Sequence, residues 1–174
     1  MKLDIIKYPN KLLFTQSEDV KSFDNDLHVF LDDMYETMIS SNGIGLAAIQ
    51  VAKPLKIFII NLLNEKEEQN KEDLLEFINP VITPLSEKTV IYEEGCLSVP
   101  DFFEEVTRYE NIKVDFQDRF GNSRSLEASG LLSIAIQHEN DHLYGHLFIE
   151  KISFLARKKF EKHIKSNKKN KDKK

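Results

Sequence analysis

The chain has 174 residues, of which 41% are hydrophobic, together with one cysteine and a formal net charge of −5. This length is enough to bury one core without disulfides or a partner, so we expect a single domain. The chain has no apolar run of about 18 residues and no hydrophobic signal segment after its start, and a lone cysteine suits a reducing cytoplasm, so a membrane-spanning or disulfide-stapled protein is excluded.

The first predicted helix covers roughly residues 24–40, where Leu27, Leu31 and Met34 recur with helical spacing. The segment 43–50, GIGLAAIQ, follows it. This pattern matches a weak dinucleotide fingerprint, but such a fingerprint needs a strand before it and a helix after it. Two interpretations remain: a structural turn in which the glycines permit close backbone approach, or an active-site loop in which Gln50 donates to a developing oxyanion.

Beyond a strand near Ile57, residues 65–73 are charged and turn-like, and they predict a surface loop between strands. The lone cysteine, Cys96, lies further along in an extended segment and directly follows Gly95. Three interpretations of it stay open. It can be a buried apolar residue, a nucleophile with a histidine partner, or a thiolate ligand of a metal ion.

The next predicted elements are two strands. Ile112, Val114 and Phe116 alternate with polar residues. Residues 118–122 then supply turn chemistry before a returning strand toward Leu126.

A helix with an apolar stripe is predicted after these strands. It can begin at residues 129–130 and stop near Gly145. Its stripe runs through Leu131, Ile134 and Ala135 into His138, so the inward face ends in an imidazole.

This helix carries the segment 137–142, which reads QHENDH. Residues four apart lie on one face of a helix, so His138 and His142 can hold one metal ion. Glu139 is placed to take a proton from a water molecule polarised by that ion. The alternative is a solvated polar end of an amphipathic helix.

The chain ends in a predicted helix, roughly residues 154–165, and a basic tail. Residues 157–174 hold ten Lys or Arg against two acidic residues, a net of +8, which leaves −13 for the first 156 residues. A solvated, frayed helix end is the ordinary interpretation of such a charge run. The other is docking on polyanionic RNA. The predicted order of elements is that of an α+β domain.

Three motifs in this order resemble the peptide deformylase family: residues 43–50 (GIGLAAIQ), 94–98 (EGCLS) and 137–142 (QHENDH). The flanks are also similar, at residues 8–9, 78–80, 108 and 130–132. The resemblance extends from roughly the first residues to about Ser153. It implies mostly antiparallel β-sheets around a central metal-binding helix, with an N-terminal helix and a C-terminal helix. It also implies that residues 1–153 form the catalytic domain and that residues 154–174 are a helix and basic tail.

The resemblance implies a reaction as well: hydrolytic removal of the N-formyl group from the N-terminal methionine of newly made polypeptides, which releases formate. In that reaction Glu139 is the general base, while the Gln50 amide and the backbone N–H of Leu97 meet the oxyanion. The family usually uses ferrous iron, with zinc, nickel or cobalt able to occupy the site. The expected ligands of this one divalent ion are Cys96, His138 and His142.

The methionine side chain needs an apolar pocket. By resemblance, Glu94 and Arg108 form an ion pair that orients the cysteine segment. Phe103 stands where some relatives carry a basic or tyrosyl side chain that contacts the substrate backbone. By resemblance, the residues expected to line the methionine pocket are Gly43, Ile44, Gly45, Tyr92, Leu131, Ile134 and Ala135.

Two other functions compete with this one. A metalloprotease that cleaves internal peptide bonds is disfavoured by the cysteine ligand and by the missing secretion signal. A non-catalytic ribosome-binding metal module is disfavoured by Glu139, because a structural metal site needs no base. The expected partners are N-formylmethionyl peptides and, through the basic tail, the ribosome; no membrane or DNA partner is expected.

Overall fold

The computed structural model describes the backbone of residues 1–171 and the side chains of residues 1–168. Within this part of the chain, no helix combines the length and the apolar character needed to cross a membrane. The helices and strands are α1 (Asn25–Ser40), β1 (Gly45–Ala47), β2 (Ile57–Ile60), β3 (Leu75–Pro84), β4 (Thr89–Cys96), β5 (Val99–Tyr109), β6 (Asn111–Gln117), β7 (Ser123–Ser129), α2 (Gly130–Leu143) and α3 (Phe154–Lys171).

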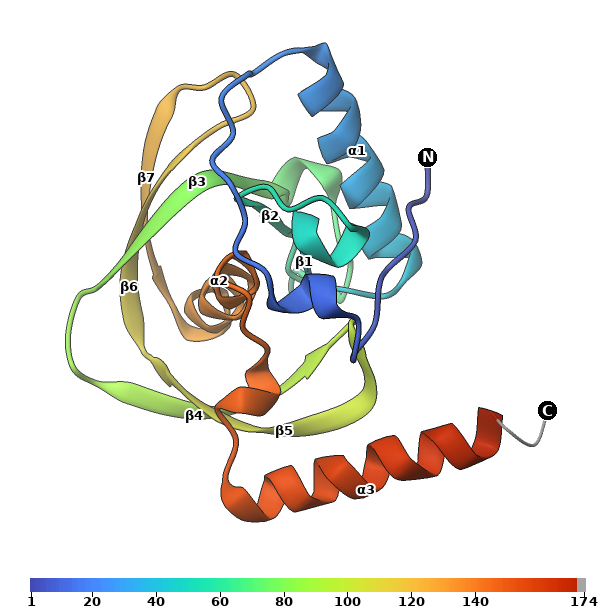
Figure 1. The fold of residues 1–174 in the computed structure, drawn as a ribbon. Helices are drawn as coiled ribbons and strands as arrows, with labels where there is room; N and C mark the ends of the chain where they lie inside the picture. Colours follow the sequence, from blue (N-terminus) through green and yellow to red (C-terminus); the bar gives the residue numbers. More distant parts are fainter. Residues whose placement is uncertain (172–174) are drawn as a thin grey trace.

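The strands form two antiparallel sheets that surround α2 (Figure 1). One sheet has the order β1-β2-β3-β6-β7, and the other is the hairpin β4-β5. Buried side chains of α2 such as Ile136 pack with Phe58 and Phe77 of the larger sheet. The expected α+β class, with antiparallel sheets around a central helix, is confirmed.

Several elements form where the sequence predicts them. The first helix begins one residue after Asp24, whose side chain caps it by accepting a hydrogen bond from the Leu27 N–H at 3.0 Å. Its predicted apolar stripe is buried, with Leu31 and Met34 fully inaccessible to solvent. The turn between β6 and β7 is closed by Asp118, as the residues between these strands indicate.

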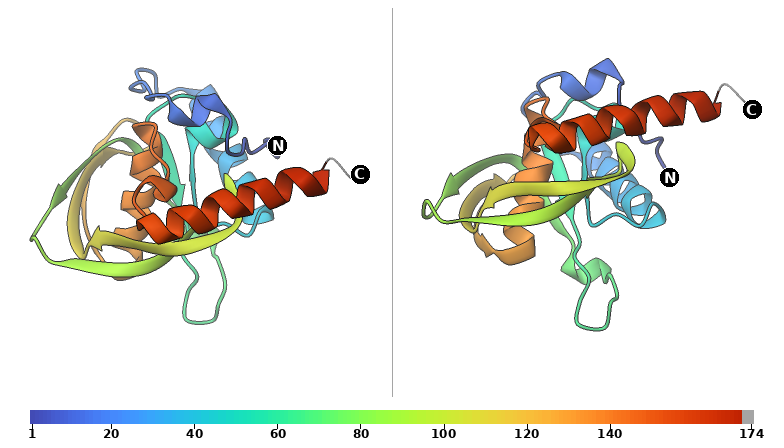
Figure 2. Two further views of the ribbon diagram at one scale, coloured as in Figure 1. Left: turned by 60° about the horizontal axis from the view of Figure 1, so that its bottom comes forward. Right: turned by 90° about the horizontal axis from the view of Figure 1, so that it is seen from below.

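The last helix is longer than predicted. It continues to Lys171 instead of ending near Lys165, because lysine is a good helix former and the sequence contains no proline or glycine there. Its C-terminal end projects beyond the rest of the protein (Figure 2). Its first turns are packed, since the Phe160 ring lies 5.1 Å from the ring of Phe102 in β5.

Candidate active site

Helix α2, which carries the histidine pair, lies in the middle of the protein (Figure 1). His138 and His142 are 8% and 1% exposed, so the interpretation as a solvated helix end is wrong. Gln137 fixes the helix against β5, because its amide accepts a hydrogen bond from the Tyr109 N–H at 3.0 Å and donates one to the Tyr109 carbonyl at 2.8 Å. This paired contact was not expected from the sequence.

Cys96 lies at the end of the β4-β5 hairpin. It pairs with Val99, so Leu97 and Ser98 form the two-residue connection. The strand register shifts at Gly95, where a side chain would place its Cβ 2.4 Å from the Phe103 ring. The hairpin end thereby reaches α2, and the cysteine Sγ lies 3.4 Å from Nε2 of His142.

The three predicted ligands come together: one donor atom from each of Cys96, His138 and His142 lies within 4.8 Å of the others. Nδ1–H of His138 donates to Oε1 of Glu94 at 2.7 Å, which leaves Nε2 as its coordinating nitrogen. A thiolate and two imidazoles with a fourth position open are the donor set of a catalytic metal site. The residues present therefore fit one metal ion.

A buried ion network supports this donor set. The Arg108 guanidinium donates to both oxygens of Glu94, at 2.7 and 2.8 Å, so the expected ion pair forms. Burial by itself raises the pKa of Glu94, but the hydrogen bonds from Arg108 and His138 outweigh it and lower that pKa to about 2. Arg108 also donates to Asp141 at 2.6 Å. Asp141 was missed from the sequence, although it lies three positions after His138 and so on the same side of the helix.

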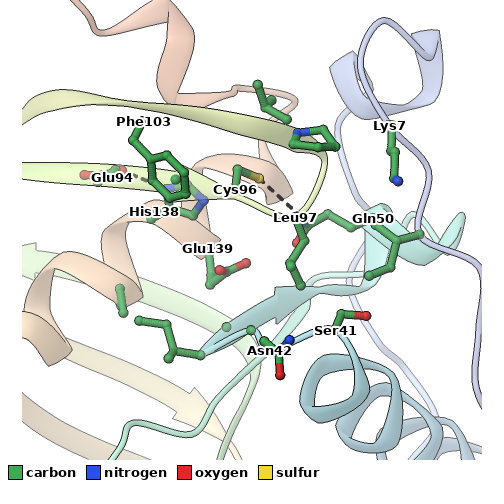
Figure 3. A pocket seen from close by; sticks show the side chains of 18 of the residues that line it. Lys7, Ser41, Asn42, Gln50, Glu94, Cys96, Leu97, Phe103, His138 and Glu139 are labelled. Atoms are coloured by element: carbon green, nitrogen blue, oxygen red, sulfur yellow. Dashed lines mark hydrogen bonds and ion pairs between the residues drawn. The ribbon is translucent and has the colours of Figure 1, made fainter. Parts of the chain in front are cut away.

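Glu139 is a buried carboxylate with unused hydrogen-bonding capacity. Its side chain is turned into the pocket between the glycine segment and Cys96 (Figure 3), and its Oε2 has no hydrogen-bond partner among the described residues. A side chain at Gly45 would place its Cβ 2.4 Å from Oε1 of this carboxylate. Burial raises the pKa of Glu139 to about 7, against the opposing charge of His138. Such a carboxylate can exchange a proton near neutral pH.

Gln50 lies on a short 3₁₀ turn after β1 and is 1% exposed. Its Oε1 accepts from the Ala47 N–H at 2.8 Å. Its Nε2 lies 3.1 Å from the Ser98 hydroxyl and 3.4 Å from Cys96 Sγ. The amide is thus beside the candidate metal ligands, and it can donate to an oxyanion by releasing one of these two contacts.

These groups open onto a cavity of about 960 Å³. The N-terminal segment forms one wall, because the Ile6 N–H donates to the Gln50 carbonyl and the Tyr8 N–H to the Ser98 carbonyl, each at 2.8 Å. This wall could not be predicted from the sequence, since the segment has no periodic pattern. Phe103, 62% exposed, also lines the cavity. The cavity is lined by all of the expected pocket residues, namely Gly43, Ile44, Gly45, Tyr92, Leu131, Ile134 and Ala135.

A Cys-His-His donor set with a carboxylate beside its first histidine, on the central helix of an antiparallel α+β fold, defines the protein as a metal-dependent hydrolase. The sequence model of the polypeptide deformylase family matches residues 2–158. The chain belongs to the peptide deformylase family.

Individual relatives agree with this assignment. The chain is 63% identical to the peptide deformylase of Campylobacter jejuni over 166 residues, which is 95% of each chain. It is 57% identical to that of Helicobacter pylori over 168 residues, 97% of this chain and 95% of the relative. Among solved structures, the Legionella pneumophila peptide deformylase is similar with a TM-score of 0.87 at 33% identity, covering 100% of this chain and 99% of that one.

Proposed function

We propose that the protein hydrolyses the formamide bond of N-formylmethionyl peptides and releases formate and a free N-terminal amine. The observation that carries this proposal is the buried Glu139 carboxylate, whose Oε2 has no partner among the described residues and which faces the cavity beside the Cys96, His138 and His142 donors. A structural metal site needs no such base, so the arrangement favours an enzyme over a binding module.

Each step can be assigned to residues of this chain. A divalent cation held by Cys96 and the two histidines would supply the positive charge that makes a water molecule acidic. Glu139 accepts a proton from the attacking water molecule as the water oxygen bonds to the formyl carbon. The Gln50 amide and the Leu97 backbone N–H donate to the carbonyl oxygen as it becomes negative. Glu139 then passes its proton to the nitrogen as the C–N bond breaks.

The same residues explain a preference for formyl over larger acyl groups. The Gly45 backbone approaches Glu139 so closely that an added Cβ would lie 2.4 Å from Oε1. A formyl group carries only hydrogen on its carbon and needs the least room there. Ile134 and Ala135 also line the cavity, and these apolar residues suit a methionine side chain.

The reaction and the metal are tested together. Protein purified without oxygen is analysed for iron, zinc, nickel and cobalt, and then assayed for formate release from a formyl-Met peptide. An internally quenched peptide without a formyl group is assayed in parallel. We propose ferrous iron as the ion and expect formate release alone; cleavage of the quenched peptide would instead favour a metalloprotease.

Gln50 should matter to turnover and little to metal binding. Gln50→Ala is expected to lower kcat by roughly 10²- to 10³-fold, because one donor to the oxyanion is lost. Metal content, measured by elemental analysis, is expected to stay near that of the unmutated protein, although the amide touches Cys96 Sγ. An unchanged kcat would remove Gln50 from the oxyanion site.

We also propose that α3 docks the protein on the ribosome. One face of the helix packs on the body through Ala156 and Phe160. The opposite face exposes a row of lysines that includes Lys158, Lys162 and Lys165. An enzyme held near the exit of nascent chains meets its substrate at a high effective concentration.

Two further expectations stay predictions. They are the cytoplasmic location and the boundary at residue 153 between the catalytic domain and the C-terminal helix.

Replacing the three outer lysines of α3 by glutamine is expected to reduce cosedimentation with ribosomes and to preserve turnover of a free formyl-Met peptide. This design is better than truncating the chain after Phe154, because truncation would uncover Phe102. Binding should weaken with salt, with a log–log slope of roughly 0.7 to 0.9 per phosphate contacted. The matched control replaces three exposed lysines of the body, Lys11, Lys21 and Lys53. Equal loss in both variants, or in neither, would contradict docking through α3.

A further inference from the structure

The loop between β2 and β3 is held in a defined shape by its own amide side chains. Asn64 Oδ1 accepts hydrogen bonds from the backbone N–H groups of Lys66 and Glu68, at 2.8 and 3.0 Å. The fully buried Asn61 donates through Nδ2 to the Asn70 carbonyl at 2.8 Å. The sequence predicted this loop as a charged surface connection. Its internal hydrogen bonds hold Gln69 at a fixed position.

Gln69 uses this fixed position to reach the glycine segment 43–45. Its Nε2 donates to the Gly43 carbonyl at 2.9 Å and to the Asn61 carbonyl at 2.6 Å. Beside it, the Asn61 N–H donates to the Ile44 carbonyl at 2.9 Å. The pairing of β1 with β2 ends at Gly45 and Ile60. The Gln69 side chain thus continues the hydrogen bonding beyond the end of the β1-β2 pair. It binds the Gly43 carbonyl, which the strand pairing does not reach.

The glycine segment has little room to move without changing the site. A Cβ at Gly43 would lie 2.7 Å from the Leu97 side chain, and one at Gly45 would lie 2.4 Å from Glu139 Oε1. Both glycines line the cavity, and Leu97 and Glu139 face this segment across it (Figure 3). A displacement of a few tenths of an ångström here would change the space between the backbone and the Glu139 carboxylate.

We propose that Gln69 is a positioning residue for deformylation: by holding the Gly43 carbonyl, it sets the distance of the glycine segment from Leu97 and Glu139 and so the shape of the space that receives the formyl-methionyl group. The inference rests on the proposed function. Gln69 is not among the residues that line the cavity, so it acts through the backbone of the glycine segment and does not touch the substrate.

The sharpest test is Gln69→Glu, which keeps the size of the side chain and removes both donors. A carboxylate would also face two carbonyl oxygens in place of the amide that binds them. We expect KM for a formyl-Met peptide to rise roughly 5- to 10-fold, the size expected for a lost hydrogen bond, with kcat within about twofold. Gln69→Asn, one methylene shorter, should show a smaller rise in the same direction.

Hydrogen–deuterium exchange gives a readout that does not depend on activity. In Gln69→Glu, exchange should accelerate in peptides that cover residues 41–47 and stay unchanged in α2 and β6. The matched control is Gln16→Glu, the same substitution at an exposed residue whose side chain makes no hydrogen bond among the described residues. It is expected to behave like the unmutated protein in both measurements.

The outcomes separate this inference from the proposed function. If the unmutated protein releases formate while Gln69→Glu keeps its KM and its exchange pattern, the positioning role is wrong and the proposed function stands. Faster exchange throughout the protein would also overturn it, because Gln69 would then support stability alone. If the unmutated protein releases no formate, the proposed function fails, whatever the exchange data say about the Gly43 contact.

Discussion

Replacing Glu139 by glutamine or alanine is expected to leave the metal in place and to remove nearly all turnover. In the proposed function the carboxylate is a proton acceptor and not a ligand, and the three donors that meet within 4.8 Å are those of Cys96, His138 and His142. Loss of a positioned base costs roughly 10²- to 10⁴-fold in rate. The measurements are formate release and metal content on the same preparation.

Glu127→Gln on the edge strand β7 is a matched control, because it makes the same change at an exposed carboxylate. This control should keep both metal and turnover. If Glu139→Gln lost its metal as well as its activity, Glu139 would be a ligand and its assignment as the base would be wrong. Glutamine is the more informative replacement, because it preserves the contact with Gly45 that alanine would remove.

Changing Cys96 to serine is expected to empty the metal site or to weaken it strongly. A hard hydroxyl replaces a soft thiolate, which changes the class of ion that the donor set prefers. The Kd for the metal should rise by more than the roughly 10- to 100-fold typical of residues that only orient a ligand. Titration of metal-free protein with Zn²⁺ or Co²⁺ measures this directly.

The Glu139→Gln protein is the natural comparison, since it is expected to lose activity and to keep its metal. A Cys96→Ser protein that bound metal normally but released no formate would point to the remaining alternative, a cysteine nucleophile. In that case mass spectrometry of the unmutated protein with substrate should detect a formyl group on Cys96. Neither result is expected, because donor atoms of two histidines, His138 and His142, both lie within 4.8 Å of the Cys96 Sγ.

The sequence predicted best those elements whose apolar positions have a clear period. Helix α1 and the strands β6 and β7 followed from periodicity and turn residues, and the histidine helix followed from its apolar stripe. The hairpin β4-β5 was not recognised as a pair, because β4 is exposed over much of its length and shows no alternation. Strand β3 contains Asn79 at a φ of +51°, followed by proline. These two residues usually mark a turn, so the sequence does not predict one continuous strand there.

The candidate site likewise contains features that the sequence predicted and features that it did not. Ligands four apart on one helix could be recognised from spacing, because helix geometry places them together. Contacts such as Arg108 to Asp141, 33 positions apart, and Gln69 to Gly43, 26 positions apart, depend on how separate elements pack. No local pattern encodes such pairs. The N-terminal wall of the cavity was missed for the same reason, since contacts between distant residues, such as the Ile6 N–H to the Gln50 carbonyl, place it there.

The metal donors come from two parts of the fold that belong to different elements and lie far apart along the chain. Cys96 is the last residue of β4, while His142 is on α2, 46 positions later. Closing a loop of this length with a covalent crosslink restricts the unfolded chain by about 4 kcal/mol in the loop-entropy account of disulfides. An ion bound here would act as a reversible crosslink of the same span. The free energy of unfolding should therefore increase with the free metal concentration.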